Sequence, residues 1–269
     1  MPNAITVIPA LAFSATLLFA APLHAEVPNR TLLSTFCDAA SIKGSTCKRA
    51  KAYPNAPRGG CDVTLTGDRF AGKFLTSRNP LLVANYESGC EAHATDDGGS
   101  VVFEQVGGAT IFRNFEPGVR TNECVTLAKD ARQDVLVCLT GHMGQGLLET
   151  GVAQIVFAQS AGKDVRMSFD MILTAEDSID AYGANVVTCK EREKYFELSK
   201  LAAGPRKATV TVDASYADAE TIRIACGKGF AKPAQTFGEL APGDAYVPEG
   251  DEKNGKLVVD LVTRKVAVQ

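Results

Sequence analysis

Two neighbouring stretches of the chain share one pattern: residues 82–115, LVANYESGCEAHATDDGGSVVFEQVGGATIFRNF, and residues 136–169, LVCLTGHMGQGLLETGVAQIVFAQSAGKDVRMSF. They align without a gap at an offset of 54 residues (136 − 82 = 54), and Phe115 falls on Phe169. Each copy has an apolar run, a glycine-containing loop, a second apolar run, a tight turn and a third apolar run. Short apolar runs between glycine turns are typical of consecutive antiparallel strands.

The strand pattern continues on both sides of these copies, so we expect a mainly β fold made of repeated antiparallel hairpin units. Four strands in a repeat of about 50 residues are typical of a small propeller-like array. A β-sandwich of consecutive hairpins is the alternative. One four-stranded unit is predicted at residues 124–128, 135–140, 154–159 and 165–169.

Several segments outside the two copies have their own local predictions. Residues 61–74 resemble a hairpin around a glycine turn, and residues 257–268 a terminal strand pair or one edge strand. Residues 191–201 have the apolar spacing of a short helix, although a further repeat would place a strand there. Residues 221–225 alternate like a strand, and residues 176–185 form an acidic loop.

The N-terminal segment has the composition of an export signal. Residues 5–21 are apolar and nearly uncharged, and Ala25 offers a small residue at the cleavage point. The alternative is an uncleaved membrane anchor, but the run is shorter than the roughly 20 residues that span a bilayer. We therefore assign residues 1–25 to a signal peptide, with no membrane span after its cleavage. The mature chain divides into a cap with a short helix, residues 26–60, and a β domain, residues 61–269.

All eight cysteines lie after the signal peptide. An even number of cysteines behind an export signal indicates disulfides in an oxidising compartment, periplasmic or secreted. The sequence has no Cys-x-x-Cys pair, which disfavours zinc binding and thioredoxin chemistry. Closure between neighbours in sequence predicts the pairs Cys37–Cys47, Cys61–Cys90, Cys124–Cys138 and Cys189–Cys226.

Composition and motifs disfavour several classes of function. The formal net charge of −3 offers no basic surface for a phosphate backbone, so nucleic acid is not an expected partner. No phosphate loop, dinucleotide fingerprint or Gly-x-Ser-x-Gly motif occurs. The acidic loop at residues 176–185 carries oxygen donors but lacks the spacing of an EF-hand. We expect neither a cofactor nor a bound metal.

The two histidines of the mature chain, His93 and His142, mark the candidate site. They occupy equivalent loops of the two copies, which predicts that they share one face of the fold. Glycines around His142 would let a ligand approach the backbone closely. The alternative is two unrelated loop histidines. The predicted ligand-binding residues are His93, Gly141, His142, Gly144 and Gln145.

The sequence shows no complete set of catalytic residues. The favoured function is therefore that of a non-catalytic module that binds a small ligand or an envelope protein. A hydrolase acting on a cell-envelope polymer is the first alternative, with His142 and a carboxylate such as Asp177 or Glu149. An envelope structural protein is the second. The sequence leaves the oligomeric state open.

Overall fold

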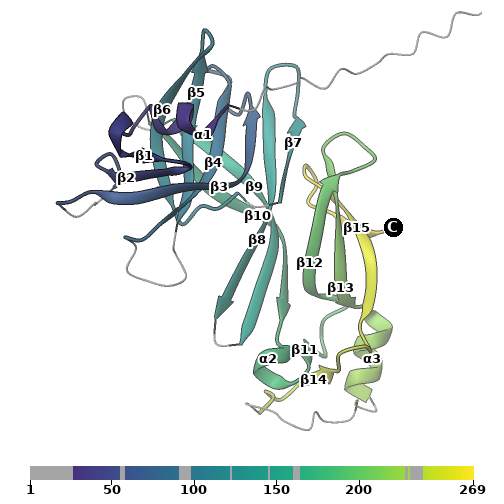
Figure 1. Ribbon diagram of the computed structural model, residues 1–269. Helices are drawn as coiled ribbons and strands as arrows, with labels where there is room; N and C mark the ends of the chain where they lie inside the picture. Colours follow the sequence, from purple (N-terminus) through teal and green to yellow (C-terminus); the bar gives the residue numbers. More distant parts are fainter. Residues whose placement is uncertain are drawn as a thin grey trace, which may run out of the picture.

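The computed structural model describes residues 27–54, 58–90, 98–121, 123–144, 146–159, 164–227, 230 and 239–269. The fold is mainly β, as predicted, with antiparallel sheets and a few short helices (Figure 1). The expected signal peptide lies outside the described residues. Within the described ranges, no helix combines the length and apolar character needed to cross a membrane.

The first sheet, sheet A, is a meander of six strands that curls into a half-barrel. Its concave side holds a core in which Leu32 and Leu33 of helix α1 are fully buried with Phe103. The elements are α1 (Asn29–Leu33), η1 (Ala39–Ser41), β1 (Ile42–Lys43), β2 (Thr46–Ala50), β3 (Cys61–Gly72), β4 (Leu81–Ser88), β5 (Gly99–Val106) and β6 (Ala109–Pro117).

The second sheet, sheet B, has the order β10-β9-β8-β7 and is the predicted four-stranded unit. Its strands are β7 (Cys124–Ala128), β8 (Asp134–Gly144), β9 (Leu147–Gln159) and β10 (Val165–Asp177). The 54-residue offset relates β4, β5 and β6 to β8, β9 and β10. Val101 pairs with Phe115 in sheet A, and the equivalent Ile155 pairs with Phe169 in sheet B. The two copies therefore form two sheets of the same strand order.

The third large sheet, sheet D, has the order β12-β13-β15-β16, and a two-stranded sheet C pairs β11 with β14. Helix α3 packs beside sheet C in a small separate core around Phe196 and Ile222. The elements are α2 (Ile179–Tyr182), β11 (Asn185–Thr188), β12 (Lys194–Ala203), β13 (Thr209–Ala217), α3 (Ala219–Gly227), β14 (Asp244–Val247), β15 (Lys253–Asp260) and β16 (Val266–Val268).

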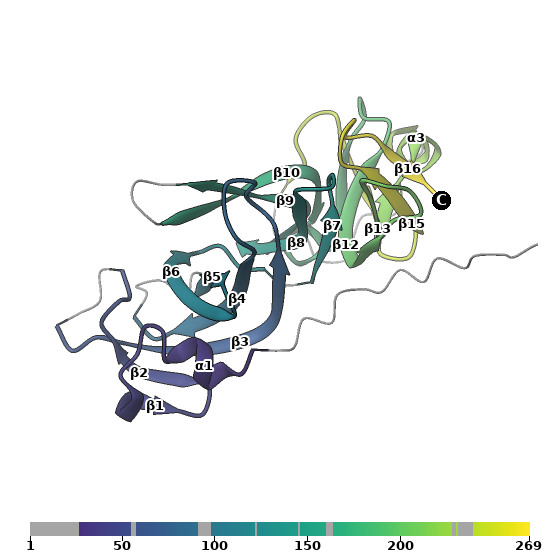
Figure 2. The same ribbon diagram turned by 90° about the horizontal axis from the view of Figure 1, so that it is seen from above.

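Sheets A, B and D stack face to face, with sheet B in the middle (Figures 1 and 2). Val83 of sheet A packs against Leu136 of sheet B in the first interface. Val137, the next residue of β8, points to the other face and packs with Val212 of sheet D. This layered stack does not confirm the propeller-like array, and its third layer also distinguishes it from a two-sheet sandwich.

Two predictions based on periodicity are wrong because β-bulges shift the alternation. Residues 61–74 are not a hairpin: β3 runs straight through, and a bulge between Thr66 and Arg69 accommodates Gly67 at φ +63°. Residues 191–201 are not helical: β12 pairs with β13 and carries bulges after Tyr195 and Ser199. A bulge moves the apolar residues out of a strict period of two. In β3 the extra residue imitates a turn, and in β12 the altered spacing imitates that of a helix.

Residues 221–225 belong to helix α3, whereas the alternation predicted a strand. Asp218 caps this helix, since the backbone N–H of Thr221 donates to Asp218 Oδ1 at 2.9 Å. Ile222 and Ala225 share its buried face. The predicted acidic loop at residues 176–185 is also more regular than expected, because it comprises the end of β10, helix α2 and the start of β11. The terminal strand pair is β15 and β16, as predicted.

The segment predicted as an N-terminal cap contains α1, as expected, but also two strands that join sheet A. Thr46 of β2 pairs with Thr64 of β3 across the predicted boundary at residue 60.

All eight cysteines form disulfides, which fits an oxidising compartment. The bonds are the four pairs predicted from closure along the sequence: Cys37–Cys47, Cys61–Cys90, Cys124–Cys138 and Cys189–Cys226.

Candidate functional site

The predicted site residues of the second copy lie at the end of a hairpin rather than in a long loop. Gly141 and His142 are strand residues of β8, and the backbone register places His142 opposite Glu149 of β9. Gly144 pairs with Leu147, so only two residues form the turn between the strands. Gln145, in that turn, lies outside the described residues. Residues 141–144 and 147–153 are therefore paired strand.

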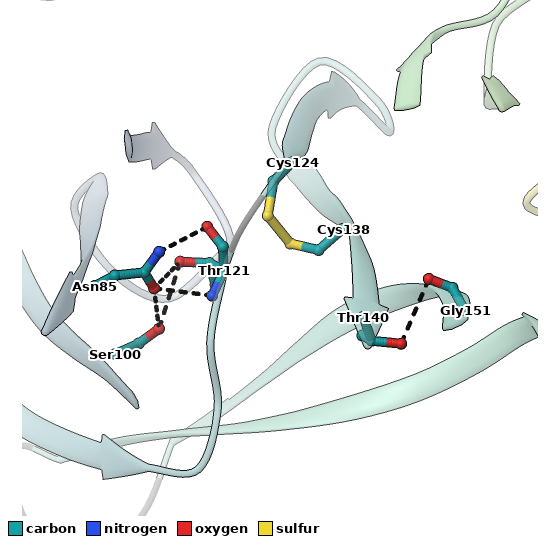
Figure 3. Close-up of a disulfide and its surroundings, with 7 residues drawn as sticks. All are labelled: Asn85, Ser100, Thr121, Cys124, Cys138, Thr140 and Gly151. Carbon is teal, nitrogen blue, oxygen red and sulfur yellow. Dashed lines mark hydrogen bonds between the residues drawn. A yellow bond between two sulfur atoms is a disulfide. The ribbon is translucent and has the colours of Figure 1, made fainter. Parts of the chain in front are cut away.

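A disulfide and a side-chain contact hold the hairpin near this end (Figure 3). Cys124 and Cys138 are directly opposed residues of β7 and β8, and their bond ties the edge strand to the hairpin. Two residues further along β8, Thr140 Oγ1 donates to the carbonyl oxygen of Gly151 at 3.4 Å. Two residues beyond Thr140, His142 pairs with Glu149 in the same ladder.

A buried polar cluster anchors the segment that enters sheet B from sheet A (Figure 3). Asn85 Oδ1 accepts hydrogen bonds at 2.8 Å from both the backbone N–H and the hydroxyl of Thr121. Asn85 Nδ2 donates to the carbonyl of Thr121 at 3.0 Å, and the hydroxyl of Ser100 donates to Asn85 Oδ1. Since Thr121 is three residues from Cys124, this cluster sets where β7 begins and is structural.

The turn of the hairpin rests on helix α2. Gly146 adopts φ +80°, and a Cβ at this position would lie 3.1 Å from the backbone nitrogen of Ala181. Such a Cβ would need the helix to give by a few tenths of an ångström, and glycine adopts this left-handed φ without strain. A hollow of about 240 Å³ adjoins the contact. It is lined by Gly146, Leu148, Asp177, Ile179, Asp180 and Glu249.

A row of directly opposed residues crosses the strands from His142 towards sheet D. Glu149 of β9 pairs with Glu176 of β10, and Lys194 of β12 forms an ion pair with Glu176 at 3.2 Å (Nζ to Oε1). Directly opposed residues of antiparallel strands lie on the same face of the sheet. The row therefore brings together two carboxylates that are 27 residues apart in the sequence (176 − 149 = 27).

This row opens into a cleft of about 370 Å³ between sheet B and the start of β12. We call it the acidic cleft; its lining residues are Glu149, Thr174, Ala175, Glu176, Glu191, Glu193, Lys194 and Tyr195. Four carboxylates face one ammonium group, a surplus of three negative charges. A concave surface with one sign of charge concentrates ions of the opposite sign. The acidic cleft thus suits a cationic group.

Tyr195 forms the less polar wall of the acidic cleft. Burial of its ring, together with the charge of Glu193 beside it, raises the pKa of Tyr195 to about 12. The phenol therefore remains protonated at neutral pH, and a hydrogen bond with the Glu193 carboxylate contributes to its raised pKa. Behind this wall, the backbone N–H of Leu198 donates to Thr150 Oγ1 at 3.0 Å, which ties β12 to β9. The acidic cleft therefore lies between sheets B and D, which this hydrogen bond joins.

The same geometry decides which carboxylate accompanies His142. Asp177 pairs with Leu148, one row beyond Glu149, and it lines the hollow beside α2. Adjacent strand residues point to opposite faces, so Glu149 is the carboxylate in the histidine's own row. Among the described residues, no group of three or more His, Cys, Asp and Glu side chains is arranged to hold a metal ion.

His93 lies outside the described residues, so its expected proximity to His142 stays a prediction. The sequence pattern pointed to Glu149 and to the acidic segment that begins at Glu176, but not to Glu191 or Lys194, which complete the acidic cleft. Comparison of the chain with protein-family models, curated proteins and solved structures finds no match.

Proposed function

We propose that this protein is an exported, non-catalytic binding module that receives a cationic group of a small ligand or of an envelope protein in the acidic cleft. The row from His142 through Glu149 to Glu176 carries the proposal, because it joins the predicted site residues to four carboxylates. Four disulfides and the sequence of residues 1–25 support a periplasmic or secreted location.

The expected contribution of these carboxylates to the binding free energy follows from their exposure to solvent. A single exposed ion pair contributes only about 0.2–1 kcal/mol. A ligand with several ammonium groups contacts several carboxylates at once. Loss of three of them is therefore expected to weaken binding by about 1.5 kcal/mol, or about tenfold.

The test uses the disulfide-bonded mature protein and a fluorescein-labelled tetralysine peptide, with binding followed by fluorescence anisotropy at low and physiological ionic strength. The triple variant Glu149→Gln, Glu191→Gln, Glu193→Gln should bind about tenfold more weakly. The matched control Glu87→Gln, Glu123→Gln, Glu239→Gln removes the same charge from exposed positions elsewhere and should change binding less than about twofold. Equal weakening by both triple variants would reduce the effect to general surface charge and overturn the proposal.

Substitutions in the predicted site extend this test. If ligand recognition includes the end of β8, His142→Gln and Gly144→Ala should each weaken binding of the same peptide. Unchanged affinity in both variants would separate the cleft from these residues and count against their predicted role.

A hydrolase acting on an envelope polymer is the second candidate, and the register of His142 opposite Glu149 is the observation that favours it. A histidine base oriented by a carboxylate is a recurrent arrangement in hydrolysis. The assay is release of soluble fragments from purified cell-wall sacculi. Release that disappears in His142→Ala and Glu149→Gln would support a hydrolase, and no release from the native protein would eliminate it for that polymer.

A further inference from the structure

The outer face of sheet D carries a second concave surface, separate from the acidic cleft. Its volume is about 470 Å³, and strands β12, β13 and β15 form its floor. We call it the sheet D groove. Its lining residues are Glu197, Ser199, Lys200, Asp213, Ala214, Ser215, Asn254, Gly255 and Lys256. The neighbouring residues Leu198, Val212 and Leu257 point the other way, into the core shared with sheet B.

Two cross-strand rows of polar side chains form the sheet D groove. The strand register aligns Ser199, Asp213 and Lys256 in the first row. It aligns Glu197, Ser215 and Asn254 in the second. In the second row the central Ser215 is shorter than Glu197 and Asn254, so these two side chains stand on either side of it. In the first row the longest side chain is that of Lys256 on β15.

The first row has a surplus of positive charge. Asp213 lies between two lysines: Oδ1 is 3.2 Å from Lys256 Nζ, and Oδ2 is 3.4 Å from Lys200 Nζ. Hydrogen bonding to Lys256, followed by that to Lys200, holds the pKa of Asp213 below its usual value. The single carboxylate of Asp213 thus pairs with two ammonium groups, which leaves one positive charge uncompensated. Both lysines are largely exposed, and exposed ion pairs are weak, so an arriving anion can share them.

A backbone irregularity places one of these lysines. Lys200 adopts φ +54°, a left-handed conformation that costs a non-glycine residue about 1 kcal/mol or more. It sits in the bulge of β12 between Ser199 and Ala202. Bulges commonly redirect a side chain towards a functional surface. Here the bulge brings Lys200 to the same carboxylate as Lys256.

The second row ends in an uncompensated negative charge. Glu197 forms no ion pair with any residue in the described part of the chain, and it is exposed. The side chains of Ser199, Ser215 and Asn254 likewise form no hydrogen bond with other described residues. The sheet D groove therefore has one cationic end, one anionic end, and free donors and acceptors between them.

We infer that the sheet D groove binds a short peptide as a zwitterion, with its free carboxylate at Lys200 and Lys256 and its free amino group at Glu197. Glu197 and Lys256 lie two strands apart and two residues apart along the strands, about 12 Å in total for spacings of about 4.8 and 3.3 Å. An extended peptide covers about 3.3–3.6 Å per residue, so three residues, about 10–11 Å, come close to this separation whereas one amino acid is too short.

The test is a titration of ¹⁵N-labelled mature protein with trialanine, N-acetyl-trialanine and trialanine amide, followed by amide chemical shifts. Trialanine should shift the amides of Ser199, Ser215 and Gly255. Each blocked peptide loses one charge contact and should bind about threefold to tenfold more weakly. Equal binding of all three peptides, or no shift with trialanine, would overturn the inference.

Two variants at exposed positions assign each end. In Glu197→Gln, trialanine and N-acetyl-trialanine should bind equally, because the partner of the amino group is gone. In the double variant Lys200→Gln, Lys256→Gln, trialanine and its amide should bind equally. Glu191→Gln, in the acidic cleft, is the matched control and should leave all three affinities unchanged. A reversed pattern, with Glu197→Gln abolishing the preference for a free carboxylate, would contradict the assigned direction.

Discussion

His142 lies directly opposite Glu149 on the paired strands β8 and β9. The distance between them along the chain is only seven residues (149 − 142 = 7), and the turn that joins their strands has two residues. This pairing places the backbone of His142 in line with Glu149 and Glu176, two residues of the acidic cleft. It also makes the conformation of the turn, and its contact with α2, part of the site.

Substitution of Gly146 should therefore destabilise the end of the hairpin. Gly146→Ala combines a left-handed backbone, which costs about 1–2 kcal/mol, with a tight contact of 3.1 Å between the new Cβ and the backbone nitrogen of Ala181. Gly44→Ala is the matched control, because Gly44 has φ +59° but open space around it. Urea unfolding should show the larger loss for Gly146→Ala. Equal losses would mean that the contact with α2 contributes nothing beyond the backbone conformation.

Glu104 should be the most sensitive charged residue of sheet A. Its side chain is 5% exposed and forms ion pairs with Arg78 and Arg113. Removal of one partner from a buried ion pair costs about 3–5 kcal/mol, so Glu104→Gln should lower the free energy of unfolding by about that amount. Glu87→Gln, at an exposed position of the neighbouring strand, should change it by less than about 0.5 kcal/mol. A loss below about 1 kcal/mol for Glu104→Gln would show that the two arginines are solvated.

The pH dependence of stability has a contribution from the cap of helix α3. Hydrogen bonding from Lys253, then from the backbone of Thr221, lowers the pKa of Asp218 to about 2. Because the folded-state pKa is depressed, this stabilisation is complete above the ordinary value of 3.8 and is lost as the pH falls towards about 2. Asp218→Asn should flatten the acid limb of the unfolding curve in this range. An acid limb identical to that of the native protein would exclude a role for this carboxylate.

Removal of the Cys124–Cys138 bond tests how firmly the edge strand β7 is held. Closure of a loop of about 15 residues is worth about 3 kcal/mol, so the double variant Cys124→Ala, Cys138→Ala should lose about that much stability. Thermal unfolding under non-reducing conditions measures the loss. A non-reducing peptide map of the native protein provides the control, since it should recover all four predicted pairs. A variant as stable as the native chain would mean that pairing of β7 with β8 alone suffices.

The features that could be predicted from the sequence are those set by residues close together in the chain. Closure between neighbouring cysteines was enough to pair Cys189 with Cys226, and alternation was enough to locate β8, β9 and β10. Alternation failed where a bulge added a residue, as at Gly67 in β3 and after Ser199 in β12. It also failed at residues 221–225, where the cap supplied by Asp218 outweighs strand-like alternation.

The acidic cleft could be predicted only in part, because its residues meet through register and sheet packing. A two-residue turn after Gly144 would have placed His142 opposite Glu149 from the sequence alone. Pairing of β10 with β9 then adds Glu176. The position of Lys194 depends on how sheet D packs on sheet B, which no local pattern encodes. This is why the cleft was recognised only in the folded chain.

Mapping of the tetralysine peptide by amide chemical shifts is the most direct test of the acidic cleft. The peptide should shift the amides of Thr150, Glu176 and Tyr195 in the native protein, and these shifts should disappear in the triple variant Glu149→Gln, Glu191→Gln, Glu193→Gln. Shifts spread over the acidic positions of the whole surface, or shifts that persist in the triple variant, would contradict a binding site in the acidic cleft.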